Sequence, residues 1–355
     1  MFFELPTTLA SRVGYATGGL GQVFAQVVEE VRAARSLARY YAPRIKPGDE
    51  EIGRKLEDTI APLLFRYTPL RFSLSWREFL GGRLYDRLVA KRLEADTKCF
   101  IGLQGQALLS LGRARQLGAE QLGLIASTPH ITHVAAQHAK AQQFCPVEED
   151  WLNPTLLRAV LAEYALADMI YTHSEYTHQS FLAAGIPSSK LHRIHLRVDP
   201  RFSKAEARAD EGVFRVVYTG IVTSHKGVPM LLEAFARLSM PDAELILVGG
   251  TGTRGMRRYV EDWQRRDPRI RLAPGDPLPW LRKASVYVHA SFQDGFSFGA
   301  MEALACGVPV IVSEDTGMKE HVRDGRNGYI VPTGDVDALH ARLEDVARHR
   351  LAGGS

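Results

Sequence analysis

Cysteine, net charge and long apolar runs are all scarce in this sequence of 355 residues. The three cysteines, Cys99, Cys145 and Cys306, are odd in number and far apart, which argues against a disulfide framework or a zinc cluster and predicts reduced thiols. A net charge of +4 is too small to indicate nucleic-acid binding, and no nucleic-acid motif is present. No apolar run approaches the roughly 20 residues of a membrane span, and residues 1–9 lack the basic start of a signal peptide. We therefore expect a cytoplasmic protein that binds no nucleic acid.

What is present is a repeated alternation of short apolar runs with helix-forming segments. The runs predict strands, and the alternation predicts α/β domains whose parallel sheets carry helices on both faces. The predicted strands are 99–103, 122–126, 169–172, 214–220, 244–253 with its glycine-rich exit, and 284–290. The length suggests two domains, and the polar linker at 203–212 marks their boundary. We place an N-terminal domain at residues 1–205, a C-terminal domain at 206–335 and a final helix at 336–355, for which packing back towards the N-terminal domain is one expectation.

The stretch 291–310 carries the strongest pattern for a ligand site. A strand is followed by a break at Asp294 and by a predicted helix from Phe298 to Cys306, and parallel sheets bind ligands at the carboxyl ends of their strands. Backbone N–H groups at a helix N-terminus favour a phosphate or carboxylate. The N–H groups concerned are those of Gly295, Phe296, Ser297 and Phe298.

Two carboxylates bracket this predicted anion site, Asp294 and, eight positions later, Glu302. Carboxylates accept paired hydrogen bonds from vicinal hydroxyls, so the layout suits a ligand with a diol at each end and a diphosphate between, as in a nucleotide sugar. The alternative is that Asp294 only caps the helix and that Glu302 is an ordinary solvated residue.

The same run resembles the C-terminal signature of retaining glycosyltransferases of the GT-B fold, family 4 (glycosyl transferases group 1), which reads E-x7-E followed by A-x-G-x-P-V. Asp294 stands where most members have the first Glu. The likeness continues through 316–320 and 325–331. The segment 162–181 is similar to the family form E-Y-x-x-A-D-x-I-x-x-x-S-x-x-x-x-x-S-F.

This resemblance implies two Rossmann-like, doubly wound domains that face each other across a cleft. It implies a metal-independent, retaining hexosyltransferase that moves a sugar from a UDP- or GDP-linked donor to a hydroxyl of a glycan, lipid or small molecule, with no further cofactor. Lys226 matches the family's diphosphate-binding Lys, whereas Ile221 stands where the family usually has Arg. The missing phosphate contact would then come from another residue, such as Arg254, Arg257 or Arg258.

The N-terminal half offers a glycine loop and a histidine cluster. The loop at 17–21 contains Gly18 and Gly19, which would face the donor phosphates in the family and otherwise serve close packing of a strand and a helix. The histidines are His130, His133 and His138. They could be metal ligands or part of a polar loop, but the family form H-I-x-x-Q favours His133, and then His130, as a residue that contacts donor sugar and acceptor.

From these patterns and the resemblance we predict His133, His130 and Asp294 as catalytic residues and no metal site. The predicted donor-binding residues are Gly18, Gly19, Lys226, Gly295, Phe296, Ser297, Phe298 and Glu302.

Three further interpretations stay open. The basic and aromatic segment 65–79, with Trp76, predicts peripheral contact with the inner face of a membrane, unless its aromatic residues are simply core. Asp335 and Asp337 form a D-x-D pattern that we expect to begin a helix and not to bind a metal. Rivals to a transferase are a sugar phosphorylase, a nucleotide-sugar epimerase and a non-catalytic binding protein on the same fold.

Overall fold

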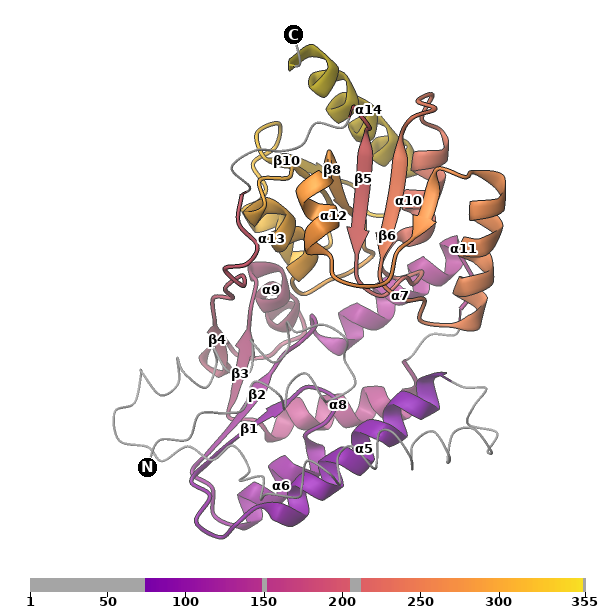
Figure 1. The fold of residues 1–355 in the computed structure, drawn as a ribbon. Coiled ribbons are helices and arrows are strands. Elements are labelled where there is room, and N and C mark those ends of the chain that lie inside the picture. The colour runs from indigo at the N-terminus through magenta and orange to yellow at the C-terminus, as the bar shows by residue number, and fades with distance from the viewer. Residues whose placement is uncertain (1–73, 149–151, 205–211, 354–355) are drawn as a thin grey trace. The chain divides into compact units, whose positions relative to one another are not determined.

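The structure, a computed structural model, describes residues 74–148, 152–204 and 212–353 (Figure 1). Gly18, Gly19 and the predicted segment 65–79 up to residue 73 lie outside the described residues. The chain divides into two compact units, Met1–Thr132 with Glu149–Leu196, and His133–Glu148 with Arg197–Ser355. We call them the N-terminal and the C-terminal unit.

The C-terminal unit therefore includes a segment that precedes the predicted boundary. Helix α7 (Ile131–Phe144) comes from the first half of the sequence, yet from His133 onwards it groups with the C-terminal unit. The reason is apolar packing, because Ala141 is buried in the core of that unit and Phe144 and Val147 pack against the same core. Packing between residues that are far apart in the sequence therefore decides to which unit α7 belongs.

The N-terminal unit contains a parallel four-stranded sheet in the order β1-β2-β3-β4. The strands are β1 (Cys99–Leu103), β2 (Gln121–Ile125), β3 (Met169–Thr172) and β4 (Leu191–Arg193). The helices are α5 (Leu74–Arg92), α6 (Leu108–Gln116), α8 (Pro154–Leu166) and α9 (Glu175–Ala183), with a 3-10 turn at Ser188–Lys190. The predicted strands 99–103, 122–126 and 169–172 are thus confirmed to within one residue.

Polar residues fix the helix ends of this unit. The Asn153 side chain accepts hydrogen bonds from two N–H groups of the first turn of α8, and the Ser174 side chain caps α9 by accepting the Thr177 N–H. Helix α6 is capped from outside, because the buried Asp86 carboxylate of α5 accepts the N–H groups of Leu109 and Ser110 at 2.6 and 2.9 Å. These contacts satisfy donors that a helix leaves without a partner in its first turn.

The C-terminal unit contains a parallel six-stranded sheet in the order β10-β9-β8-β5-β6-β7. The strands are β5 (Arg215–Thr219), β6 (Glu244–Val248), β7 (Ile270–Leu272), β8 (Val286–His289), β9 (Val310–Ser313) and β10 (Gly328–Val331). The helices are α10 (Val228–Ala236), α11 (Arg254–Arg266), α12 (Leu278–Lys283), α13 (Phe298–Ala305) and α14 (Val336–Gly353), with a 3-10 turn at Gly317–His321.

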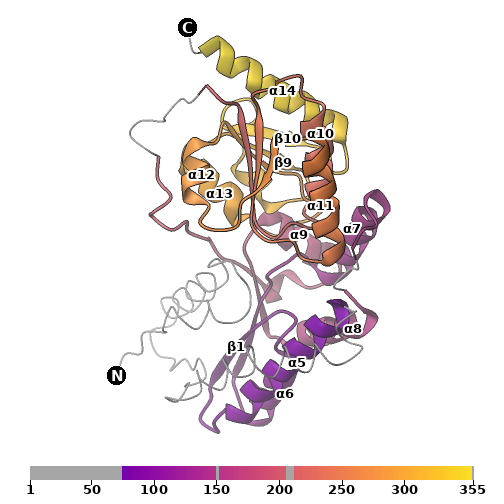
Figure 2. The ribbon, with the colours of Figure 1, turned by 45° about the vertical axis from the view of Figure 1, so that its right-hand side comes forward.

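This strand order is that of a doubly wound, Rossmann-like sheet. The chain runs outwards from β5 to β7 and returns on the other side at β8, so the order reverses between β5 and β8. Figure 2 shows α10 and α11 on one face of the sheet and α12 and α13 on the other. In such sheets a crevice opens beyond the carboxyl ends of the two strands at the reversal.

Helix α14 belongs to the core of the C-terminal unit. Leu339 and Leu343 are fully buried, and the helix packs against α10. Asp335 begins it as predicted, with its carboxylate accepting the Ala338 N–H at 2.8 Å. A position of the segment 336–355 towards the N-terminal unit stays a prediction.

All three cysteines are free, as expected, and all three are buried. Among the helices of the described part of the chain, none combines the length and the apolar character needed to cross a bilayer.

Candidate functional site

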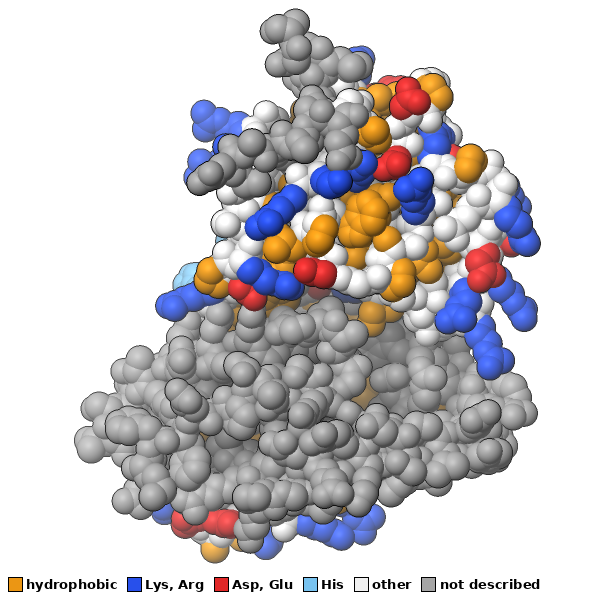
Figure 3. Space-filling model, in the orientation of Figure 1, with side chains coloured by type: hydrophobic (Ala, Val, Ile, Leu, Met, Phe, Trp, Pro, Cys, Tyr) orange, Lys and Arg blue, Asp and Glu red, His pale blue; other side chains and the backbone are white. Residues whose placement is uncertain are grey.

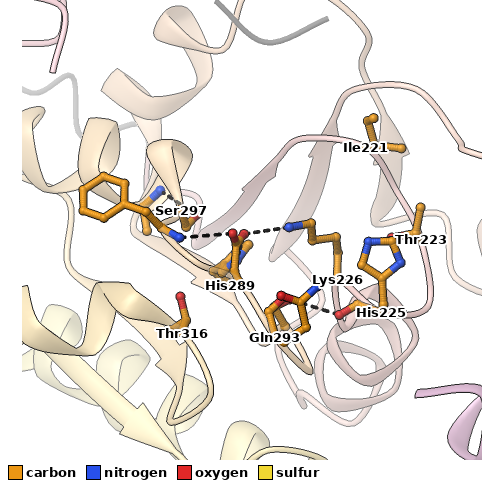
Figure 4. Close-up of polar contacts among 12 residues, drawn as sticks. Ile221, Thr223, His225, Lys226, His289, Gln293, Ser297 and Thr316 are labelled. Carbon is orange, nitrogen blue, oxygen red and sulfur yellow. Dashed lines mark hydrogen bonds and ion pairs between the residues drawn. The ribbon is translucent and has the colours of Figure 1, made fainter. Parts of the chain in front are cut away.

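The candidate site lies where the loops that follow β5 and β8 meet, at the reversal of strand order. Lys226 is in the first loop and Asp294 in the second, and the Lys226 ammonium donates to the Asp294 carboxylate at 2.7 Å. The dashed line from the Lys226 ammonium in Figure 4 marks this contact. Two residues that are 68 positions apart in sequence, and that sequence analysis selected separately, are therefore direct partners.

Close backbone packing sets the distance between these loops. Gly227 has a φ of +70°, and a Cβ atom at this position would lie 1.8 Å from the carbonyl oxygen of Ala290. The Phe292 N–H and the Ser291 hydroxyl both donate to the His225 carbonyl, at 2.9 and 3.0 Å. His225, the residue before Lys226, is thus bonded directly to the loop after β8. At position 227, the residue after Lys226, only glycine lets the backbone come this close to that loop.

Asp294 is held as an ionised carboxylate. Its Oδ2 atom also contacts Nε2 of His289 at 2.9 Å, and its Oδ1 atom accepts the Phe296 N–H at 3.3 Å. Burial alone would raise the pKa of Asp294, but the Lys226 ammonium and the His289 hydrogen bond together hold it well below its ordinary value. The site therefore contains a stable Lys226–Asp294 ion pair around neutral pH.

The N-terminus of α13 comes four residues after Asp294 in the sequence. The helix begins at Phe298 as predicted, and Ser297 caps it by accepting the Ala300 N–H at 3.3 Å. Of the N–H groups predicted to bind an anion, that of Phe296 already donates to Asp294. Gly299 lets the helix approach the sheet, because a Cβ atom there would lie 2.1 Å from Oγ1 of Thr219.

Glu302, the second predicted carboxylate, lies one turn into α13. Burial raises its pKa to about 7, with Asp199 and Asp276 adding to the effect and Arg201 opposing it. Arg201 is itself paired with Asp276 at 3.3 Å and with Asp199 at 3.5 Å, so its charge is shared. Glu302 is thus a carboxyl group that changes charge near neutral pH.

The predicted histidines fall in different units. The His130 ring is buried in the N-terminal unit against Tyr164 and Phe181, with ring centroids 4.9 and 5.2 Å away, so it has a clear packing role. His133 is on the part of α7 that groups with the C-terminal unit. Burial lowers its pKa, Asp315 of the loop after β9 opposes the effect, and Lys140 and Lys319 add to it, so His133 is within electrostatic range of that loop. That loop also contacts the site, because the Asp294 N–H donates to the Asp315 carbonyl at 3.1 Å.

Ile221, where the family usually has Arg, and the arginines of α11 concern the phosphate contact that the sequence leaves open. The Ile221 side chain is 45% exposed, and Figure 4 shows it apart from the group around Lys226. Arg254, Arg257 and Arg258 are exposed in the first turns of α11, over which basic side chains gather in Figure 3. A phosphate contact from one of these arginines stays a prediction.

Sequence reasoning missed several residues of the site. His289 is the last residue of a buried strand and is only 3% exposed, yet it bonds Asp294. A polar residue at the carboxyl end of an apolar strand was the available signal. His138 was named only as a member of the histidine cluster, and no local pattern in the sequence indicates its contact with Gln293 or the contact of Glu148 with Ser224. No group of three or more His, Cys, Asp or Glu side chains that could hold a metal ion occurs within the ranges that the structure describes.

Residues 213–349 match the family described as Glycosyl transferases group 1. The D-inositol 3-phosphate glycosyltransferase of Pseudarthrobacter chlorophenolicus is 32% identical over 162 residues, 41% of this chain and 39% of that protein. The GDP-mannose-dependent alpha-(1-6)-phosphatidylinositol monomannoside mannosyltransferase of Mycolicibacterium smegmatis is 30% identical over 209 residues, 51% of this chain and 53% of that protein. The chain thus spans about two fifths to half the length of these relatives.

Among solved structures, Anabaena HepE in complex with UDP-glucose superposes with a TM-score of 0.61 at 18% identity, covering 76% of this chain and 73% of HepE. At that identity the likeness shows the fold alone. The fold is the GT-B type with two Rossmann-like units, which confirms the predicted fold class.

Proposed function

We propose that the protein is a glycosyltransferase that moves a sugar from a nucleotide-sugar donor to an acceptor hydroxyl, in keeping with the match of residues 213–349 to the family described as Glycosyl transferases group 1. The observation that carries the proposal is the Lys226–Asp294 contact of 2.7 Å, at the reversal of strand order and directly before α13. This is the place where a Rossmann-like sheet binds ligands.

Charge is the chemical difficulty of the reaction. As the glycosyl phosphate bond breaks, negative charge grows on the departing diphosphate while the sugar becomes oxocarbenium-like. The Lys226 ammonium and the positive end of α13 are fixed in place before the reaction, so they can stabilise that charge without reorganising. We propose that they do this without a bound metal and that the sugar keeps its anomeric configuration.

Hydroxyl recognition falls to the carboxylates. Glu302, once ionised, can accept both hydroxyls of the ribose, and Asp294 lies at the opposite end of the predicted diphosphate position. His133 has a lowered pKa and is therefore neutral at pH 7, which suits it to share a proton with a hydroxyl of the sugar or the acceptor. His130 is the second candidate for this role.

The donor we propose is a hexose linked to UDP or GDP. The HepE structure contains UDP-glucose, and the name of the mycobacterial relative specifies GDP-mannose. The acceptor class, whether glycan, lipid or small molecule, is left open.

Nucleotide binding tests the proposal most directly. Isothermal titration calorimetry with UDP and with GDP should show binding of at least one to the wild-type protein. Lys226→Met should weaken that binding about 10- to 100-fold, because it removes a charge-assisted contact. Lys283→Met is the matched control, since Lys283 is an exposed lysine of α12, and it should bind as the wild type does.

The same preparation separates the rival functions. Thermal stabilisation by inorganic phosphate but by neither nucleotide would contradict the proposal and favour a phosphorylase. Product formation from a nucleotide sugar without an acceptor would favour an epimerase. Unchanged turnover in Glu302→Ala and His133→Ala would favour a non-catalytic binding protein.

For the N-terminal unit we propose peripheral contact with the inner face of a membrane. Trp76, Leu80 and Leu84 of α5 are each more than a third exposed and are spaced four residues apart, which places them along one face of the helix. The exposed Arg87 and Lys91 continue the same helix and could meet anionic headgroups. Cosedimentation with anionic liposomes at low salt tests this contact, and Trp76→Ala should reduce the bound fraction.

A further inference from the structure

One imidazole links the two loops of the candidate site. His138 of α7 accepts a hydrogen bond from the Gln293 side-chain amide, with 3.0 Å between the two Nε2 atoms. Its ring also stacks on that of His225, with ring centroids 4.4 Å apart. Gln293 directly precedes Asp294 and His225 directly precedes Lys226. His138 therefore touches the neighbour of each member of the ion pair.

The carboxylate of Glu148, which follows α7, also binds the loop that contains Lys226. Glu148 accepts the Ser224 N–H with one oxygen and the Thr253 hydroxyl, at 3.0 Å, with the other. The Ser224 hydroxyl donates to the Cys145 carbonyl at 3.2 Å. Both the backbone and the side chain of Ser224, two residues before Lys226, are thus bonded to residues 145–148.

Residues 138–148 also pack closely against the rest of the C-terminal unit. A Cβ atom at Gly255 would lie 1.9 Å from the carbonyl oxygen of Val147, so the start of α11 rests directly on the chain between α7 and Glu148. Thr253, which caps α11 by accepting the Met256 N–H, is the same residue that donates to Glu148. Residues 138–148 thereby contact the loops after β5, β6 and β8 together.

The charge of Glu148 is informative in itself. A carboxylate near a site for a diphosphate opposes ligand binding by simple electrostatics. Its presence there is understandable if its hydrogen bonds set the shape of the loop that presents Lys226.

We propose that His138 and Glu148 are positioning residues for donor binding, which hold the loops 221–227 and 290–294 in the arrangement that brings Lys226 to its ligand. This inference rests on the proposed function. It assigns to a segment from the first half of the sequence a role inside the donor-binding unit.

The test compares truncated with conservative variants in nucleotide titrations with UDP and GDP. Glu148→Ala removes both acceptors and should weaken binding about tenfold or more. Glu148→Gln keeps an acceptor oxygen for the Ser224 N–H and can donate from its amide to Thr253, so it should bind as tightly as the wild type. Glu261→Ala, which truncates an exposed carboxylate of α11, is the matched control and should change nothing.

A double variant separates positioning from plain destabilisation. If Glu148 acts through Lys226, then adding Glu148→Ala to Lys226→Met should weaken binding no further than Lys226→Met alone. A loss that adds in full to the loss from Lys226→Met would overturn the inference. Wild-type affinity in Glu148→Ala, or lost affinity in Glu148→Gln, would overturn it as well.

Variants of His138 test the inference independently if Glu148→Ala does not fold. His138→Ala should weaken binding, and His138→Gln, which restores an acceptor for Gln293, should recover part of the affinity. Equal affinity of these two variants would contradict the role given to His138. If the wild-type protein binds neither nucleotide, the proposed function fails first, and the two failures are thereby distinguished.

Discussion

Replacement of Glu302 by glutamine should stabilise the protein and weaken nucleotide binding at the same time. Burial raises the pKa of Glu302 to about 7 from its ordinary 4.5, so the folded state keeps a proton that the unfolded state releases. Between these two values stability falls as the pH rises, and above pH 7 the whole penalty is present. The amide in Glu302→Gln never ionises, and the variant therefore escapes the penalty.

The size of the effect follows from the pKa difference. A change from 4.5 to about 7 corresponds to about 3 kcal/mol. Glu302 is only partly buried, so water reduces this to about 1 to 2 kcal/mol. For a unit of this size the thermal midpoint of Glu302→Gln should lie about 2 to 8 °C above that of the wild type at pH 8.

Thermal melts at several pH values provide the assay and its internal control. At pH 4.5 both side chains are neutral and the two proteins should melt together, whereas the difference should grow through pH 7 and then level off. Because every other titrating group is common to both proteins, the difference isolates Glu302. A difference that does not depend on pH would refute the environment derived for Glu302. Nucleotide affinity at pH 8 should fall about tenfold in the variant, since an amide offers one acceptor oxygen where the carboxylate offers two.

Two further predictions address packing and catalysis. Gly299→Ala should destabilise the C-terminal unit by about 1 to 3 kcal/mol in urea unfolding, because the added Cβ atom would lie 2.1 Å from Thr219 Oγ1 and 2.4 Å from the Tyr287 hydroxyl. Gly112→Ala, a helix position with nothing within 4 Å of the new atom, should instead stabilise by about 0.5 to 1 kcal/mol, and destabilisation of equal size at both sites would contradict the argument. His133→Ala should lower kcat about 100-fold with nucleotide affinity unchanged, and the exposed His192→Ala should leave both constants at their wild-type values.

The local structure around the site could be predicted from the sequence. The strand 284–290 was predicted and β8 spans Val286–His289, while the helix predicted from Phe298 to Cys306 is observed from Phe298 to Ala305. A short apolar run determines the strand, and Gly295 and Gly307 bound the helix-forming segment, with little help from the rest of the chain. The rule that parallel strands share one carboxyl edge then places Lys226 and Asp294 on the same side of the sheet.

The contacts that complete the site could not be predicted in this way. Glu148 and Ser224 are 76 residues apart, and His138 and Gln293 are 155 residues apart. Their meeting depends on where α7 packs, and a boundary placed from linker composition assigns α7 to the N-terminal domain. The position of α7 is decided by Ala141, Phe144 and Val147, whose apolar side chains pack into the core of the C-terminal unit. Their spacing in the sequence predicts a buried face but does not say in which unit that face is buried.

The Lys226–Asp294 pair explains why an acidic residue stands beside a site for an anion. A lysine ammonium is carried on a flexible stem and loses conformational entropy when it is held against a ligand. In this structure Asp294 already fixes it at 2.7 Å, and His289 in turn fixes Asp294 at 2.9 Å, so part of that entropy is lost on folding and not on binding. A diphosphate carries more charge than one carboxylate, and it can therefore draw the prepositioned ammonium towards itself while Asp294 keeps its hydrogen bonds to His289 and Phe296. Under the proposed function, the acid would support the lysine in the absence of ligand and would become available to sugar hydroxyls once the lysine turns to the phosphates.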